Sequence, residues 1–200
     1  MNTVPWWSSE QWWRKVAIWV TAFMAVILII LTFDSVAKIS VGGDRVPGYA
    51  VINQRIYYRL DNERHYAVPV VGDEAPLFGT VLSEAEATEL VTHGKLTFQS
   101  KNCINCHTIL GNGAYYAPDL TKAWLDPAWV AESVREQLML EFLMDPTTNA
   151  RTFGTDRRMP HLDITETEAR ALIAFLKWTS SIDTNGFPSG FAPIRQEGDR

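Results

Sequence analysis

Cys103-Ile104-Asn105-Cys106-His107 is a C-x-x-C-H motif, and it contains both cysteines of the 200-residue chain. At this spacing two thiols can add to the two vinyl groups on one edge of a porphyrin, and the histidine that follows can give the iron an imidazole nitrogen. The motif therefore predicts one covalently attached haem c, with Cys103 and Cys106 as thioether links and His107 as an axial ligand.

Other interpretations of the two cysteines are excluded or less favoured. A thioredoxin-like redox pair needs a strand-helix-strand setting, which the flanking sequence lacks. Two cysteines cannot form the framework of a disulfide-rich mini-protein. A tetrahedral zinc site needs four ligands, and His65, His93 and His161 lack zinc-finger spacing from the pair. A chance C-x-x-C-H is the alternative that stays open.

A haem iron with one histidine needs a second axial ligand or an open face. The candidates are Met139, Met144, Met159 and His161. Met159 precedes a proline, which disfavours a helix there, and an extended segment 52 residues after His107 can fold over the other haem face. We expect Met159 to be the sixth ligand, with His161 or an open site as the alternative. The other two methionines lie in a predicted helix, where methionine usually fills the core.

Residues 16–33, VAIWVTAFMAVILIILTF, carry no charge. With Trp12 and Trp13 at its start, the run matches the ~20 apolar residues that cross a ~30 Å hydrocarbon core, where tryptophan is typical of the headgroup level. We predict an uncleaved membrane anchor. The alternatives are a signal peptide cleaved after Ser-Val-Ala at 35–37, although its apolar region is usually only ~7–15 residues, and a buried core helix.

The distribution of charge bears on orientation and on partners. Arg14 and Lys15 before the apolar run, and Asp34 after it, predict a cytoplasmic N-terminus with the rest of the chain on the other side. From residue 34 onward there are 16 basic and 22 acidic residues, which argues against nucleic acid and suits a basic soluble partner, or solubility alone. Arg157 and Arg158 can pair with haem propionates or be solvated loop cations.

A β-hairpin is predicted over residues 51–71. Apolar and polar residues alternate from 52 to 60, Asp61-Asn62 is turn chemistry, and residues 66–70 can return as a second strand. Pro69 favours an edge position, because proline cannot donate a ladder hydrogen bond.

Capping boxes predict the start of two helices. Ser83 with Glu86 begins one that runs to about residue 100, and Thr165 with Glu168 begins one that ends near residue 181. Gly94 is expected to weaken the first helix locally.

A third helix is predicted between them. Asp126 followed by Pro127 is typical of an N-cap with proline at the first helical position, and Asp145-Pro146 should end the helix. Its spacing places three apolar residues on one face: Val130, Val134 and Leu138.

Several longer runs resemble the cytochrome c subunit of bacterial nitric oxide reductase. They are GKL at 94–96, KNCINCHTILGNGAYYAPDL at 101–120, RMP at 158–160 and FLKWTSSIDTN at 175–185. The resemblance implies a mainly α fold, with a single N-terminal transmembrane helix, a mono-haem class I cytochrome c domain and a small β-hairpin extension between them. The expected division is 1–37 cytoplasmic N-terminus and transmembrane anchor, 38–81 periplasmic linker with the hairpin, 82–190 cytochrome c domain and 191–200 C-terminal tail.

The resemblance also implies a location and partners. Such a protein is single-pass in the bacterial inner membrane, with its N-terminus cytoplasmic and its haem domain periplasmic. It accepts electrons from a soluble cytochrome c or a cupredoxin and passes them to haem b of a large polytopic catalytic subunit, which performs 2 NO + 2 e⁻ + 2 H⁺ → N₂O + H₂O. The family pattern assigns the axial ligands to His107 and Met159, and it places Gly113 and Tyr115 near a calcium ion at the interface with the large subunit.

Three alternatives to this function stay open. A related enzyme that reduces O₂ could carry the same small subunit, and a free-standing membrane-anchored cytochrome could carry electrons between complexes. A haem peroxidase or sensor would instead need a five-coordinate iron. The 38–82 extension looks longer than in the shortest family members, and its role is not indicated by the sequence.

Overall fold

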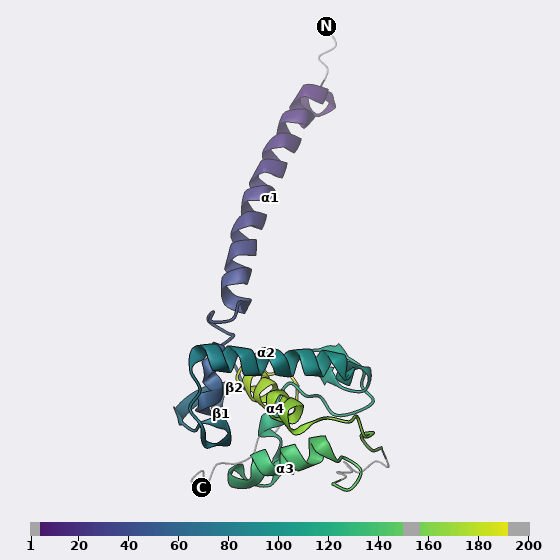
Figure 1. The fold of residues 1–200 in the computed structure, drawn as a ribbon. Helices are drawn as coiled ribbons and strands as arrows, with labels where there is room; N and C mark the ends of the chain where they lie inside the picture. The colour runs from purple at the N-terminus through teal and green to yellow at the C-terminus, as the bar shows by residue number, and fades with distance from the viewer. Residues whose placement is uncertain (1–4, 150–156, 192–200) are drawn as a thin grey trace.

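The computed structural model describes residues 5–149 and 157–191. One long helix, α1 (Glu10–Ile39), stands away from the other elements, which pack together at its C-terminal end (Figure 1). No residue of α1 is buried within the chain. Its 30 residues span about 45 Å at the usual helical rise, so the helix continues past both ends of the predicted run 16–33.

The two ends of α1 differ from its middle. Near the N-terminus the rings of Trp6 and Trp12 pack edge-to-face with centroids 4.8 Å apart. In the last turns, Lys38 Nζ lies 2.9 Å from the Asp34 carboxylate. By length and composition α1 is able to cross a membrane, and aromatic and charged ends around an apolar middle are typical of such helices.

The predicted hairpin is confirmed. It consists of antiparallel β1 (Gln54–Asp61) and β2 (Tyr66–Glu74), and Pro69 lies in β2, where both strands of the two-stranded sheet are edges. The Asp61 carboxylate accepts hydrogen bonds from two of the following backbone N–H groups and so fixes the turn. The residues before β1 form a 3-10 turn, η2 (Tyr49–Asn53), instead of the start of the strand.

Helices α2 (Glu84–Ser100) and α4 (Glu166–Ser180) begin at the two predicted capping boxes, and both boxes are present. The expectation that Gly94 weakens α2 is wrong, because α2 runs through it unbroken. A Cβ at this position would collide with the backbone carbonyl of Ala171 in α4. Glycine therefore permits the close crossing of the two helices.

The predicted middle helix is only partly correct. Asp126 caps a short 3-10 turn, η6 (Pro127–Trp129), and α3 (Glu132–Met144) begins five residues later than expected. Val130 lies between them with a φ of 66°, which no helix can accommodate. Val130 is 74% exposed and Val134 is 43% exposed, so the predicted apolar face is wrong. The buried residues of α3 are Arg135, Met139 and Leu140.

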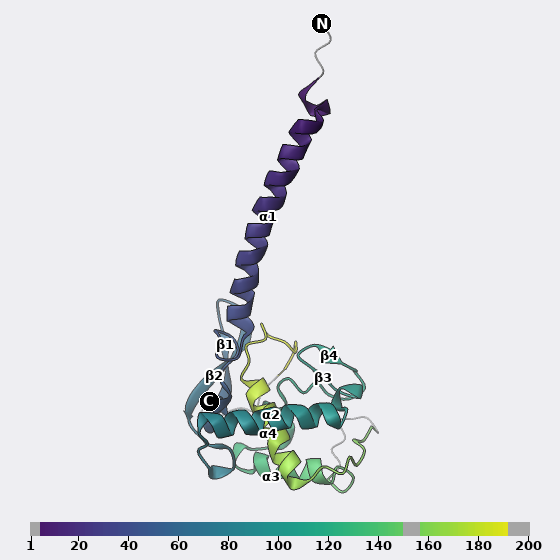
Figure 2. The same ribbon diagram turned by 45° about the horizontal axis from the view of Figure 1, so that its top comes forward.

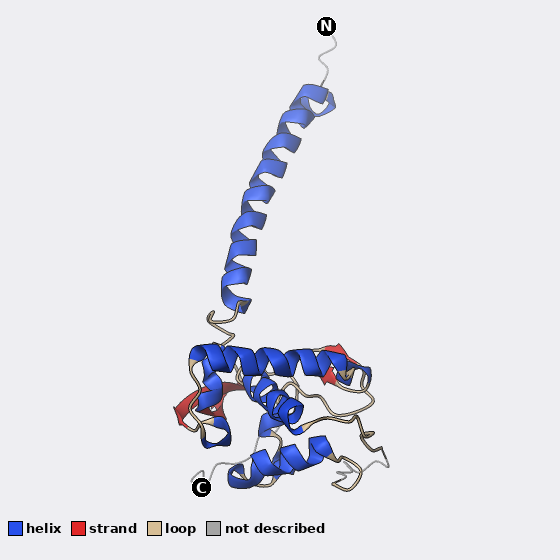
Figure 3. Ribbon diagram, viewed as in Figure 1, coloured by secondary structure: helices blue, strands red, loops and turns tan. Residues whose placement is uncertain are grey.

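The core of the domain forms around α4, which packs against α2 and α3 (Figure 2). Val46, Val51, Ile52 and Ile56, from the linker before α2, belong to the same buried cluster as Ile173 in α4. Strands are confined, in the described residues, to the hairpin and to a short pair, β3 (Thr108–Ile109) and β4 (Asn112–Gly113), as Figure 3 shows. The fold is therefore mainly helical, as predicted, and the linker packs onto the domain it precedes.

Candidate haem site

Segments that are far apart in the sequence line one cavity beside the C-terminal end of α2. Its walls include Cys103, Cys106, His107, Pro118, Asp119, Leu120, Ala123, Trp129, Phe142, Arg157, Arg158, Met159 and Leu162. All four residues that the sequence predicts as haem ligands or links therefore face the same space. Most of the remaining wall is apolar or aromatic, which suits a porphyrin.

The backbone of the C-x-x-C-H motif is tightly folded. After α2 ends, Asn102 adopts a left-handed φ of 54°, and a 3-10 turn, η4 (Cys103–Asn105), follows. The N–H of His107 donates to the carbonyl of Cys103 at 2.9 Å. Both cysteines and the histidine are thus held within one turn of chain.

Gly113 closes the loop behind this turn. It has a φ of 116°, and a Cβ there would collide with the carbonyl oxygen of His107. Only glycine fits this left-handed conformation and this close approach. Tyr115, two residues later, is 79% exposed.

A hydrogen bond fixes the orientation of the His107 ring. Nδ1 lies 2.7 Å from the carbonyl oxygen of Pro118, and because a carbonyl only accepts, Nδ1 carries the proton. Nε2 is then unprotonated and free to bind a metal. Burial lowers the pKa of His107, which also favours the neutral, ligating form.

The cysteines do not have the electrostatics of a redox pair. Burial raises the pKa of Cys103 to about 11, so its sulfur is a neutral thiol at neutral pH. Reactive cysteines in C-x-x-C redox motifs instead have a lowered pKa. This favours haem attachment over the thioredoxin-like alternative.

Of the four candidate sixth ligands, the structure brings only Met159 to the lining of this cavity in the described part of the chain. Met139 is 1% exposed in the core of the domain, as expected for a methionine in α3. Met144 packs partly buried against that core. The ring of His161 lies 3.1 Å from the carboxylate of Asp163.

The Met159 segment is bound on both sides. Arg157 donates to the carbonyl of Tyr116 at 2.6 Å, and its guanidinium stacks over the Tyr116 ring at 4.7 Å from the centroid. On the other side, Lys101 Nζ donates to the carbonyl of Asp163 at 2.9 Å. The segment is therefore tied to the loop that follows the haem motif and to the end of α2.

The donor set fits a haem. Two neutral thiols, an oriented imidazole and a thioether line one largely apolar cavity, and Arg157 and Arg158 are in its lining as candidate partners of propionates. In the described residues no group of three or more His, Cys, Asp or Glu side chains could hold a separate metal ion.

Comparison with known proteins gives the same result. A family model, Cytochrome c, matches residues 91–180. The cytochrome c subunit of nitric oxide reductase from Stutzerimonas stutzeri is 37% identical over 108 residues, which are 53% of this chain and 69% of that protein. The chain belongs to the family of nitric oxide reductase cytochrome c subunits. The family proteins of Halomonas halodenitrificans and Paracoccus denitrificans are 38% and 36% identical, over 50% and 54% of this chain and 66% and 70% of theirs.

As a member of this family, the chain is an electron-transfer cytochrome with a haem c cofactor. The single apolar helix α1 fits a membrane-anchored protein. The predicted cofactor and the resemblance to this family are thereby confirmed, while the roles of the individual haem residues stay predictions.

Sequence reasoning missed two buried lysines. Lys122 and Lys177 are each 2% exposed. Lys177 Nζ donates to the backbone carbonyls of Ile52 and Ala75, at 2.7 and 2.9 Å, and so ties the linker to α4. Its position among the apolar residues of α4 was a usable signal. Lys122 lies in a loop, where no local pattern indicates burial.

Proposed function

We propose that this chain passes electrons through one haem c to the haem b of a nitric oxide reductase catalytic subunit. Cys103 and Cys106 would hold the haem as thioethers, and His107 and Met159 would be its axial ligands. The single observation that carries the proposal is the cavity that these four residues line together. The relatives, whose names make them parts of nitric oxide reductase, support the identity of the partner enzyme.

When bound, the haem supplies a reversible one-electron centre. The chain's own residues set its environment. The Pro118 carbonyl holds the proton on His107 Nδ1 and orients the ring, and the ties of Arg157 and Lys101 hold Met159 over the opposite side. Trp129 and Phe142, whose rings pack 5.9 Å apart, exclude water from the wall of the cavity. With both axial positions filled, the chain transfers electrons and does not itself reduce NO.

The proposal also fixes a location. α1 would span the bacterial inner membrane in contact with lipid, with its N-terminus cytoplasmic and the haem domain periplasmic, as Arg14 and Lys15 indicate. The mildly acidic domain would accept electrons from a soluble cytochrome c or a cupredoxin. A calcium ion near Gly113 and Tyr115 would need carboxylates from the large subunit, because this part of the chain offers backbone oxygens and a phenol.

The test is to tag the chain, extract it gently from its native membrane, and measure anaerobic NO consumption and O₂ consumption with a reduced donor. NO turnover with a co-purifying subunit that holds haem b is the expected result. O₂ turnover without NO turnover would assign the chain to a related oxidase. A cytochrome that purifies alone under several mild detergents, with neither activity, would contradict the proposal and favour a free-standing carrier.

A further inference from the structure

Lys122 is a buried cation behind the wall of the haem cavity. It follows Asp119 and Leu120 and precedes Ala123, three residues that line the cavity. Its side chain is 2% exposed, and Nζ donates to the backbone carbonyl of Ile182 at 2.6 Å. A lysine is almost never buried so completely, because its charge loses the solvation of water.

The hairpin covers this lysine on its outer side. Lys122 Nζ lies 5.1 Å from the centroid of the Tyr58 ring in β1, which is cation–π distance. The Tyr58 hydroxyl donates to the carbonyl of Ser180 at the end of α4, at 3.4 Å. Tyr58 therefore lies between the ammonium group and solvent, and it is held in place from α4.

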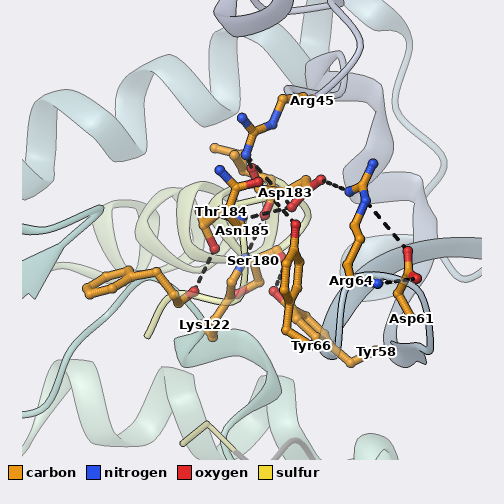
Figure 4. Close-up of polar contacts among 12 residues, drawn as sticks. Arg45, Tyr58, Asp61, Arg64, Tyr66, Lys122, Ser180, Asp183, Thr184 and Asn185 are labelled. Atoms are coloured by element: carbon orange, nitrogen blue, oxygen red, sulfur yellow. Dashed lines mark hydrogen bonds and ion pairs between the residues drawn. The ribbon is translucent and has the colours of Figure 1, made fainter. Parts of the chain in front are cut away.

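Asp183 fastens the hairpin and the linker over Lys122. Arg64 of the hairpin turn donates to the Asp183 carboxylate at 3.0 Å, and Arg45 of the linker donates to its backbone carbonyl at 2.9 Å (Figure 4). Beside them the Tyr66 hydroxyl donates to the Asn185 side chain at 3.2 Å. These contacts join the 38–82 extension to the segment that follows α4.

The charged and titratable groups around Lys122 come from three sides. Asp119 lies on the cavity side, Asp183 follows α4 with Arg45 and Arg64 paired to it, and Tyr58 belongs to the hairpin. Burial lowers the pKa of Lys122 to about 7, although the negative charges of Asp183 and Asp119 oppose the fall. Burial also raises the pKa of Tyr58 well above its usual range, so that ring is neutral.

We propose that the hairpin is a cover that keeps Lys122 as a water-excluded cation behind the haem cavity, and that this charge raises the midpoint potential of the haem. A nearby positive charge disfavours the ferric haem, which carries one positive charge more than the ferrous haem, and exclusion of water strengthens the effect. The 38–82 extension would then be a tuning element. This inference rests on the haem site proposed above.

The first test is the midpoint potential of the full chain, purified with its haem, in Lys122→Met. At the wild-type midpoint half of the haem is reduced, and we expect the ratio of reduced to oxidised haem in the variant to fall severalfold at the same poise. Lys177→Met is the matched control, because it removes another buried lysine whose hydrogen bonds go to the linker, and its ratio should not change. Lys122→Arg, which keeps the charge, should restore the ratio.

An unchanged ratio in Lys122→Met, or an equal fall in Lys177→Met, would overturn the inference. The visible spectrum of the reduced haem must be the same in all variants, which separates loss of charge from loss of an axial ligand. Absence of covalent haem in the wild-type chain would instead defeat the proposed haem site, so the two failures can be told apart.

A second measurement does not depend on whether Lys122→Met folds. In the wild type the midpoint potential should fall as the pH rises through the neutral range, because Lys122 then loses its proton and its charge. In Lys122→Arg the charge persists, so the fall over this range should be smaller. Equal slopes in the two proteins would also overturn the inference.

Discussion

The two sides of the cytochrome domain are closed in different ways. On the hairpin side, the chain provides its own partners: Lys177 binds two linker carbonyls, and Trp178 Nε1 donates to the carbonyl of Pro47 at 2.9 Å. On the haem side, the chain provides walls around a cavity, and one buried oxygen of Asp119 has no hydrogen-bond partner among the described residues. The difference teaches that the hairpin side is complete in itself, whereas the haem side needs its cofactor to fill the core.

The largest expected effect is the loss of the haem. In the Cys103→Ala, Cys106→Ala double variant we expect no covalent haem and no cooperative unfolding transition, because a domain of this size depends on the porphyrin for much of its buried apolar surface. Hydrogen exchange should increase most in residues 103–120 and 157–163. A near-native cooperative transition, or equal loss of protection in the hairpin, would contradict the comparison.

Removal of the sixth ligand should leave the haem attached but change its state. In Met159→Ala we expect the low-spin spectrum of the reduced haem to be lost and the midpoint potential to fall, because a thioether ligand raises it. Met144→Ala, which alters a methionine packed against the core, should keep the wild-type spectrum. A spectrum that survives unchanged in Met159→Ala would show that the ligand assignment is wrong, and His161→Ala would then be examined.

The crossing of α2 and α4 joins the two sides, so a change there should destabilise both. Gly94→Ala places a Cβ against the carbonyl of Ala171 and should lower the free energy of unfolding by roughly 1–3 kcal/mol. Gly48→Ala is the control, because its added Cβ meets no atom within 4 Å and its backbone is compatible with alanine. Denaturant unfolding of both variants measures the difference, and equal stability would refute the packing explanation.

The smallest expected effect is a pH dependence on the hairpin side. Burial lowers the pKa of Lys177 from 10.5 to about 8, so between these values the unfolded chain binds more protons than the folded one. The free energy of unfolding should therefore rise with pH across this window, and the rise should be smaller in Lys177→Met. Lys95→Met, which alters an exposed lysine of α2, should keep the wild-type dependence. The comparison fails if Lys177→Met and Lys95→Met behave alike.

Local signals predicted the anchor helix, the hairpin, both capping-box helices and the haem motif, because each depends on residues close in sequence. The start of α3 was missed because Val130 takes a backbone conformation that only the surrounding structure imposes. Gly94 was misread because its reason is Ala171, far away in the chain. Lys122 was missed for the same reason, since the residues that bury it lie on the hairpin and after α4.

The most direct test of the central claim is rapid mixing of the purified oxidised complex with a reduced soluble donor, followed at the bands of haem c and haem b. We predict that haem c is reduced first and haem b follows, and that in a complex with Cys103→Ala and Cys106→Ala haem b stays oxidised over the same period. Reduction of haem b at the wild-type rate in that variant would show that electrons bypass this chain and would contradict the account.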